Sequence, residues 1–423
     1  MKIGIIGLGD MGKLYAKAFA AAGMDVCGCD LYENVKTLNK ELIGSSISVL
    51  DSIKDVTEQA QVIVFSVGID QLQSVVEQVG KVIQPHSLVI GQCAVKTIEI
   101  EAFERYLPEE TQIVSCHSLH GPYLSSKGQS LAVIRYRCSD ETFPKAIEIL
   151  EALGSKIIEI ENYKHHDQMM ADTQAVTHLG FLSMGTAWKN AGFFPWENEA
   201  YFGGLDSVKI LLMLRIYAGR CHVYSDLAIR NPWAKRQVSQ YALSASELFK
   251  LMIQEDEKGL RDRVMQAKRV IFDKNPQKKK LLDQKTLEKI HLSGPRKLKS
   301  KPNSHLSLLA MVDAWSKLEI NPYQHLICQT PLYRLRLGIV EHLYSDDELL
   351  EQTVNTALCD RKIRGDDLEF HTAVSNWSSL IENEDTQAYQ KCFEETKIFF
   401  RERLEEGLKK SNELIKKFCS GSD

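Results

Sequence analysis

The sequence lacks features that would each point to a particular class of protein. No apolar run approaches the length that an α-helix needs to span a bilayer, so we expect no membrane partner. Basic residues are not in excess, because 52 lysines and arginines stand against 56 aspartates and glutamates and leave a formal net charge of −4. This balance gives no electrostatic case for binding nucleic acid or an anionic membrane surface.

Paired cysteines are also absent, although the chain has 10 cysteines. They form no CxxC pair and show no even spacing; Cys27 and Cys29 stand two residues apart within a predicted strand. This pattern is typical of reduced, mostly buried thiols rather than of a disulfide framework or a zinc site, so we expect no metal. A strand-like run follows Met1 directly and leaves no room for a signal or transit peptide. We therefore expect a soluble protein of the cytoplasm.

The material that is present suffices for more than one domain. A chain of 423 residues exceeds the size of one ordinary domain, so two or three are expected. With 44% hydrophobic residues, each of them can bury a sizeable core.

A glycine-rich turn opens the chain. Residues 2–6 (KIGII) predict a buried parallel strand, residues 13–22 a helix ended by Gly23, and residues 24–29 a second strand. Between the first strand and the helix lies a GxGxxG motif, whose glycines allow a tight turn and let the backbone approach a pyrophosphate on the helix N-terminus. The predicted cofactor contacts from this turn are Gly7, Leu8, Gly9, Asp10, Met11 and Gly12. The order strand, turn, helix and strand predicts a dinucleotide-binding fold.

An acidic residue, Asp30, ends the second predicted strand. A carboxylate there would bind a ribose 2′-hydroxyl and repel a 2′-phosphate, which favours NAD. Lys36 in the following segment is either a phosphate contact or a solvated surface lysine. The residues by themselves therefore favour NAD weakly.

Alternating strands and helices continue up to residue 162. Strands are predicted at 62–67, 88–90, 131–134 and 155–161, and helices at 69–82 and 143–153. Ser66 and Val67 end one of these strands and should border the cofactor. Lys96 lies in the loop after the strand at 88–90, where it either pairs with a substrate or neighbouring carboxylate or simply begins a helix. We expect residues 1–162 to form one α/β domain of the Rossmann type.

The segment 111–122, TQIVSCHSLHGP, places a histidine near the end of a predicted strand. Ile113 and Val114 read as buried strand, and His117 follows at the edge where ligands of open α/β sheets bind. A histidine there suits proton transfer near neutral pH. The alternative is a histidine that caps a turn, and His120 is open to the same two interpretations.

From residue 163 onward the pattern becomes helical. Residues 166–188 have helical spacing throughout, which puts Asp167, Gln174 and His178 on one face. Because buried polar groups need partners, this face indicates either a polar pocket or a helix–helix contact with a satisfied histidine. A second predicted helix, 208–228, carries Arg215 among apolar residues, where it needs an anionic partner such as a carboxylate.

The helical half also contains an apparent repeat. Residues 177–196 resemble 304–323, and motifs around Arg215 recur around Arg336, at a shift of 127 residues for the first pair of segments. We therefore expect an all-α region of two related modules, 163–271 and 304–423, although chance matching of amphipathic helices is the alternative. The Lys-, Pro- and Ser-rich residues 272–303 predict a connection rather than a nucleic-acid patch.

Several of these segments together resemble prephenate dehydrogenases, in particular the fungal branch of that family. The matching segments are GLGDMG, GQCAVKT, CHSLHGP, HDQMMADTQAVTHLGFLSMG, LRIYAGRCHVYSDLAI and PNSHLSLLA. They are spread over nearly the whole chain. The resemblance implies oxidative decarboxylation of prephenate in tyrosine biosynthesis, with NADP as cofactor in the fungal branch. NADP is therefore expected here, against the weak NAD preference of Asp30.

The resemblance also assigns roles to residues. The family's catalytic histidine falls on His117, a second pocket histidine on His178 and the substrate-carboxylate arginine on Arg215. Ser118 replaces the family's usual proline. Ala94 stands where many bacterial members have a serine near the reacting hydroxyl of the substrate, so this loop supplies no second donor to that hydroxyl unless Ser118 does. Lys96 and Ser118 complete the expected catalytic group.

Other functions remain open at this point. Arogenate dehydrogenase has the same chemistry, and an inactive NADP-binding regulatory protein would keep the fold without turnover. The 6-phosphogluconate and 3-hydroxyacid dehydrogenases share the domain order but use a lysine–asparagine helix motif that is not found here. Bacterial prephenate dehydrogenases are dimers through their helical domains. This chain is therefore expected to be either a homodimer or an internally duplicated pseudo-dimer.

Overall fold

The structure is a computed structural model that describes residues 1–275, 280–282, 287, 301–324 and 330–420. The chain divides into two compact units, Met1–Gln168 (unit 1) and Met169–Asp423 (unit 2), and each is considered by itself. Much of the predicted connection 272–303 lies outside the described residues.

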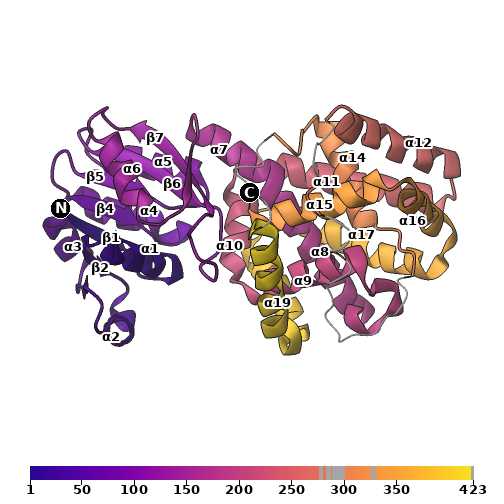
Figure 1. Ribbon diagram of the computed structural model, residues 1–423, viewed down its shortest axis with the longest axis horizontal. Helices are drawn as coiled ribbons and strands as arrows, with labels where there is room; N and C mark the ends of the chain where they lie inside the picture. Colours follow the sequence, from indigo (N-terminus) through magenta and orange to yellow (C-terminus); the bar gives the residue numbers. More distant parts are fainter. Residues whose placement is uncertain (276–279, 283–286, 288–300, 325–329, 421–423) are drawn as a thin grey trace. The chain divides into compact units, whose positions relative to one another are not determined.

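Unit 1 is built on a sheet of eight strands in the order β3-β2-β1-β4-β5-β6-β7-β8 (Figure 1). Their bounds are β1 Lys2–Ile6, β2 Asp25–Cys29, β3 Ile47–Val49, β4 Val62–Phe65, β5 Leu88–Gly91, β6 Gln112–Ser118, β7 Ser130–Arg137 and β8 Lys156–Glu159. All pairings from β3 to β6 are parallel, β7 runs antiparallel to β6, and β8 is parallel to β7. The Rossmann-type α/β fold expected from the sequence is confirmed.

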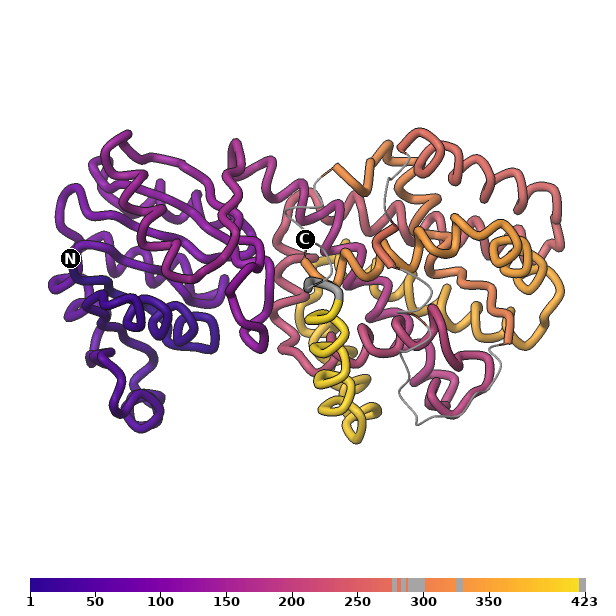
Figure 2. The backbone as a smooth tube through the Cα atoms, viewed as in Figure 1, coloured from indigo at the N-terminus to yellow at the C-terminus, as the bar shows by residue number. Residues whose placement is uncertain are grey.

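Helices cover both faces of this sheet, as the alternation of strand and helix along the chain requires (Figure 2). One core joins the strands to α1 (Asp10–Ala21), α2 (Tyr32–Glu41) and α6 (Phe143–Glu151). The other joins them to α3 (Ile53–Gln59), α4 (Ile69–Gly80) and α5 (Lys96–Tyr106). The sequence analysis missed α2 and α3, which are mostly polar, and β3, which has only three residues.

Unit 2 is entirely helical where it is described. α7 (Tyr163–Met170) leads into it across the boundary, and the remaining α-helices are α8 Val176–Ala191, α9 Gly204–Ala218, α10 Cys221–Ser225, α11 Ala234–Ile253, α12 Glu257–Lys268, α14 Leu306–Leu318, α15 Pro331–Ser345, α16 Asp347–Cys359, α17 Arg361–Glu382, α18 Thr386–Phe399 and α19 Arg401–Ser420. None of the described helices is long and apolar enough to cross a membrane.

Two predicted helices differ from the observed ones. The helix expected at 166–188 is interrupted by a π-helical turn, Ala171–Ala175, so a uniform 3.6-residue spacing does not hold across it. The helix expected at 208–228 ends at Ala218, because Gly219 takes an extended conformation (φ −77°, ψ −169°) before α10 begins. A second π-helical turn, Asp226–Arg230, follows α10.

Candidate active site

The glycine-rich turn has the geometry of a phosphate cradle. Gly7 has a positive φ of 94°, and a Cβ added there would lie 2.4 Å from the carbonyl oxygen of Ser66. A Cβ on Gly12 would lie 1.9 Å from the carbonyl oxygen of Gly7, whereas one on Gly9 would meet nothing within 4 Å. The open space at Gly9 adjoins the N-terminus of α1, which begins at Asp10. These residues fit a dinucleotide whose pyrophosphate rests on the helix N-terminus.

The carboxylate of Asp30 is turned toward this turn. Its Oδ2 accepts a hydrogen bond from the Leu8 backbone N–H at 2.6 Å. Its Oδ1 accepts from the Leu31 backbone N–H at 2.8 Å and from Asn34 Nδ2 at 2.7 Å. Both carboxylate oxygens therefore accept hydrogen bonds from the protein itself, and Asp30 links the glycine-rich turn to the end of β2.

Ser66 and Val67 follow β4 at the carboxyl end of the sheet, beside the same turn. The Ser66 backbone N–H donates to the Ile6 carbonyl at 2.8 Å, and its hydroxyl donates to Gln92 Oε1 at 3.1 Å. Both residues are half-buried. They lie beside the glycine turn, and their role at the cofactor stays a prediction.

His117 lies inside β6 rather than beyond it, because the strand continues to Ser118. Cα pairing with β7 sets His117 opposite Ala132 and Ser118 opposite Leu131. Since side chains alternate along a strand, Ser115 and His117 share one face of the sheet, while Cys116 and Ser118 share the other.

His117 belongs to a chain of three side chains. Its Nδ1 lies 3.0 Å from Nε2 of His166, and Nδ1 of His166 lies 2.9 Å from Oδ1 of Asp167. Oδ1 and Oδ2 of Asp167 also accept hydrogen bonds from the backbone N–H groups of Lys96 (2.8 Å) and Thr97 (2.7 Å), at the start of α5. The carboxylate thereby satisfies two donors that a helix N-terminus leaves open.

Lys96 occupies a fully buried ion pair. Its Nζ donates to Glu99 Oε1 at 2.9 Å and to the Cys116 carbonyl at 2.6 Å. Glu99 also accepts from the Ser115 hydroxyl and, at 2.6 Å, from the Cys93 backbone N–H. Of the partners that the sequence left open for Lys96, the structure provides the neighbouring carboxylate.

Burial sets the charge state of these histidines. It lowers the pKa of His117 well below the ordinary value of 6.5, and the nearby His166, Lys96 and His120 lower it further. Burial also lowers the pKa of His166, against the opposing effect of Asp167. Both imidazoles are therefore neutral near pH 7.

Ser118 and His120 flank this chain of side chains. Ser118 Oγ lies 2.7 Å from the hydroxyl of Tyr15 on α1, so it contacts the side of the sheet opposite to that of His117. His120 Nδ1 lies 3.1 Å from the Gly121 carbonyl, and its buried Nε2 has no partner among the described residues.

In unit 2, His178 lies within α8 and is 7% exposed. Its ring meets the edge of Tyr224 with centroids 4.9 Å apart. Burial, with a smaller effect of Arg336, lowers its pKa to about 3. Its buried Nδ1 has no hydrogen-bond partner in the part of the chain that is described. Gln174, predicted to share its face, instead donates to Met170 Sδ at 2.9 Å.

Arg215 lies in α9 and connects it to the last helix. Its Nη1 donates to the Ser411 hydroxyl at 3.3 Å and to the side-chain oxygen of Asn412. The predicted polar face of 166–188 is also divided: Asp167 caps α5 in unit 1, whereas Gln174 and His178 belong to unit 2.

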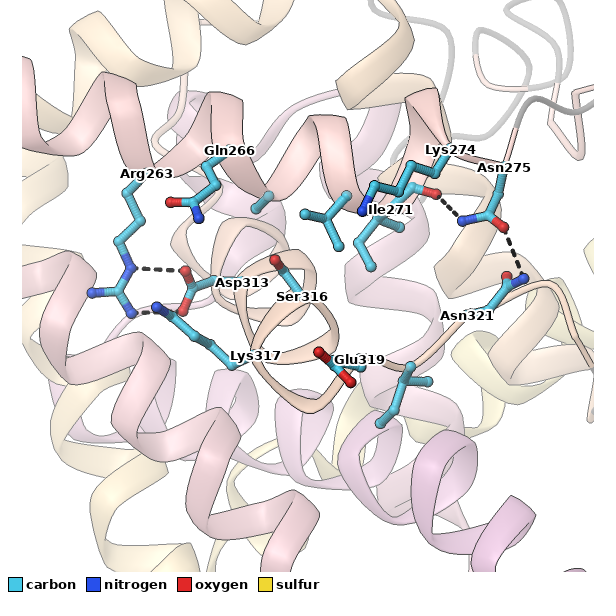
Figure 3. Close-up of a pocket in the computed structure, with 13 residues that line it drawn as sticks. Arg263, Gln266, Ile271, Lys274, Asn275, Asp313, Ser316, Lys317, Glu319 and Asn321 are labelled. Atoms are coloured by element: carbon cyan, nitrogen blue, oxygen red, sulfur yellow. Dashed lines mark hydrogen bonds and ion pairs between the residues drawn. The ribbon is translucent and has the colours of Figure 1, made fainter.

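A separate pocket of about 440 Å³ lies in unit 2 (Figure 3). It is lined by residues of α12 and α14 and by the segments after them, and it contains none of the predicted site residues. Arg263 in its wall donates two hydrogen bonds to Asp313, both with N···O distances of 2.7 Å, and a further one to Glu247. The positive charge of Arg263 is therefore balanced by these carboxylates. No cluster of potential metal ligands occurs among the described residues.

The sequence analysis missed the partners that organise His117. His166 was not singled out, and Asp167 was assigned to a pocket face with Gln174 and His178. A usable signal was the adjacent pair His166-Asp167 at the end of the α/β domain, since a histidine beside an acid is a common way to orient a ring. Glu99 carried no such signal, because a helix-start glutamate is ordinary in sequence.

Comparison with family models matches both units. Residues 2–161 match the NAD binding domain of 6-phosphogluconate dehydrogenase. Residues 175–420 match a 6-phosphogluconate dehydrogenase C-terminal domain, which spans both predicted helical modules in one model.

Two fungal relatives align along nearly the whole chain. A probable prephenate dehydrogenase [NADP(+)] of Schizosaccharomyces pombe is 42% identical over 98% of this chain and 97% of its own length. The prephenate dehydrogenase [NADP(+)] of Saccharomyces cerevisiae is 42% identical over 99% and 94%, respectively. A crystal structure of prephenate dehydrogenase from A. aeolicus superposes with a TM-score of 0.50 at 16% identity, covering 62% of this chain and 94% of that one, which shows a shared fold.

Proposed function

The chain belongs to the prephenate dehydrogenase family, and on this premise we propose that it oxidatively decarboxylates prephenate to 4-hydroxyphenylpyruvate with NADP as cofactor, in tyrosine biosynthesis. The structural observation that carries the proposal is the position and charge state of His117. This histidine is neutral and lies at the carboxyl end of a central strand, on the edge where open α/β sheets bind ligands.

The cofactor fits the residues of unit 1. Gly7 and Gly9 would let its pyrophosphate approach the backbone, and Gly12 would keep α1 close to that turn, with Ser66 and Val67 beside them. NADP, when bound, supplies the acceptor for the hydride that leaves C4 of prephenate. The hydrogen bonds that Asp30 accepts from Leu8 and Leu31 give its carboxylate a task in holding the glycine-rich turn, which serves NADP as well as NAD.

His117 has two tasks in this reaction. Its imidazole takes the proton of the 4-hydroxyl as the C4–H bond breaks, so that the oxygen becomes a ketone. The bond between the ring and its carboxylate then breaks, carbon dioxide leaves, and the electron pair makes the ring aromatic. The same histidine returns the proton to the phenolate oxygen, so no net proton is released. General-base assistance of this kind contributes about 10²- to 10⁴-fold in rate.

In unit 2 we keep His178 and Arg215 as proposed substrate contacts. The unpartnered, buried Nδ1 of His178 supports its role, since a buried polar atom without a partner in the described part of a folded protein is rare. For Arg215 the support is the family resemblance together with its planar fork of donors, which suits a carboxylate.

We also propose that unit 2 arose by internal duplication and forms a pseudo-dimer within one chain. Helix bounds support this: α9 and α15 begin at Gly204 and Pro331 and end at Ala218 and Ser345, so both ends are displaced by 127 residues. The starts of α11 and α17, Ala234 and Arg361, show the same displacement.

Packing supports the same proposal. α8 packs on α17, and its counterpart α14 packs on α11, which is the counterpart of α17. Each module thus places its first helix on a later helix of the other module. Light scattering should find a monomer, because the contacts of a dimer are already made within the chain. A tight homodimer through these helices would contradict the proposal.

The reaction is tested by following nicotinamide reduction after adding prephenate, with NADP and NAD in parallel and arogenate as a second substrate. Reduction of NADP with prephenate is the expected result. Turnover with NAD alone would overturn the proposed cofactor, and turnover of arogenate alone would overturn the substrate. A protein that binds NADP tightly but turns over neither substrate would be a binding protein.

A further inference from the structure

We propose that Asp167, acting through His166, sets the tautomer and the orientation of His117, so that Nε2 of His117 is the nitrogen that receives the substrate proton. The inference rests on the proposed function only in naming that proton; the hydrogen-bond chain itself belongs to unit 1. His166 and Asp167 are positioning residues, because neither is required to touch the substrate.

The argument begins at the carboxylate. The two oxygens of Asp167 face the backbone N–H groups of Lys96 and Thr97. A backbone N–H can only donate, and each of these groups donates its single hydrogen to the carboxylate. Both oxygens must therefore act as acceptors, as they do in the ionised carboxylate at a helix N-terminus. The side chain of Asp167 is completely buried, so this arrangement is shielded from water.

The next link is His166. Its Nδ1 lies 2.9 Å from Oδ1 of Asp167, which is an acceptor, so Nδ1 must carry the hydrogen. The ring has no exposed surface, and burial keeps it neutral. A neutral imidazole has one N–H, so Nε2 of His166 carries a lone pair and can only accept.

The last link is His117. Its Nδ1 lies 3.0 Å from that lone pair on His166, so Nδ1 of His117 must be the donor. Because this ring is also neutral, its own Nε2 is left unprotonated. The accepting carboxylate of Asp167 thus determines the tautomer of both rings and leaves Nε2 of His117 as the basic nitrogen. The two rings meet edge to face, with an interplanar angle of 64°, which also restricts rotation of His117.

Replacing Asp167 with asparagine makes a specific prediction. The single oxygen of the amide can accept from only one of the two backbone N–H groups. Where it keeps the bond from Thr97, the amide N–H takes the place of Oδ1, faces His166 Nδ1 and reverses the chain. His166 would carry its hydrogen on Nε2 and donate to Nδ1 of His117, whose hydrogen would move to Nε2. The base would be blocked although every hydrogen bond between these three side chains is still made.

The first test reads the tautomer directly and needs no turnover. In protein with ¹⁵N-labelled histidine, imidazole correlation spectra should show His117 protonated at Nδ1 and bare at Nε2; the His117→Asn variant identifies its signals. Asp167→Asn should reverse that pattern. A wild-type His117 protonated at Nε2 would overturn the inference, whether or not the protein turns over prephenate.

The second test uses kinetics. Asp167→Asn and His166→Phe should each lower kcat about 10²- to 10⁴-fold while changing KM for prephenate and NADP less than about threefold. His166→Gln should recover part of the loss, because its side-chain oxygen can accept the bond from His117. His165→Ala, at the neighbouring half-exposed histidine, is the matched control and should stay near wild type. If Asp167→Asn and His166→Phe both keep wild-type kcat, the inference is wrong.

Discussion

Lys96 and Glu99 form an ion pair closed to solvent, with Nζ and Oε1 2.9 Å apart and neither side chain exposed. Through the Ser115 hydroxyl and the Cys116 carbonyl the pair links the start of α5 to the two residues of β6 that directly precede His117. Gly91 makes room for it, because a Cβ there would lie 2.2 Å from the Glu99 carboxyl carbon. The pair is part of the frame that holds His117.

Removing only one partner of this ion pair should cost more stability than replacing both partners together. Lys96→Met leaves the Glu99 carboxylate buried without its cation, and we expect a loss of about 3–5 kcal/mol in the free energy of unfolding. The double variant Lys96→Met with Glu99→Gln should recover part of it. Urea unfolding measures both. The exposed pair of Lys81 and Glu77 is the control, where Lys81→Met should change stability by less than about 1 kcal/mol. Equal effects at the two lysines would contradict this.

His117→Asn should lower kcat by about 10²- to 10⁴-fold with KM for prephenate changed little, because the variant loses the base but keeps a polar side chain of similar reach. Steady-state kinetics with NADP measure it. His86→Asn, at an exposed histidine of the same unit, should leave kcat unchanged. Near-normal kcat for His117→Asn would exclude this residue as the base.

Arg215→Ala should raise KM for prephenate about 10- to 100-fold, the cost of losing one charge-assisted hydrogen bond. The Kd of NADP should not change. Arg361→Ala, which removes an exposed arginine of unit 2, serves as the control. Equal weakening of substrate and cofactor would instead indicate a structural arginine that joins α9 to α19.

Asp30→Ala should weaken NADP and NAD by the same factor, about tenfold, because its carboxylate supports the glycine-rich turn through Leu8. The Kd values of both cofactors measure it. A loss confined to NAD would mean that Asp30 serves the ribose.

Lys36 tests the recognition of the 2′-phosphate separately. This lysine is exposed in α2, the helix that follows the end of β2. Lys36→Ala should weaken NADP about tenfold and leave NAD unchanged, since only NADP carries the extra phosphate. Lys40→Ala on the same helix is the control. An unchanged NADP Kd would show that Lys36 is a surface lysine.

His305 should make stability depend on pH. Burial, with the neighbouring Lys209, lowers its pKa to about 3, against 6.5 in the unfolded chain. Between these values the unfolded state binds one more proton than the folded state, so stability falls as pH falls. The variant His305→Asn removes the imidazole that binds this proton, and asparagine tolerates the left-handed backbone conformation there (φ 46°). Relative to the variant, wild type should lose roughly 1 kcal/mol between pH 6.5 and pH 5.5, since a full pH unit below the unfolded pKa is worth about 1.4 kcal/mol. Parallel stability curves in urea titrations would contradict it.

The local pattern of the sequence was sufficient for the frame of unit 1. The GxGxxG turn, the strands around it and the position of His117 near the end of β6 were all predicted, because a strand, a tight turn and a helix each leave a signal within a few residues. The helical character of unit 2 was predicted for the same reason. The π-helical turn at Ala171–Ala175 was not, since an added residue in one turn does not disturb the composition on either side. The end of α9 before Gly219 was also missed, although a glycine at that point is a common signal for the end of a helix.

The amino-acid sequence by itself thus determined the fold class, the cofactor turn and the histidine expected to move the proton, because these depend on local spacing and on an order of elements with few solutions. Only the tertiary structure decided which groups act on that histidine. Asp167 caps a helix that begins 71 residues earlier, Lys96 turns to Glu99, and Ser118 lies on the opposite face from His117. Such partners are chosen by burial, because each polar group taken out of water needs a complementary group from wherever the fold supplies it.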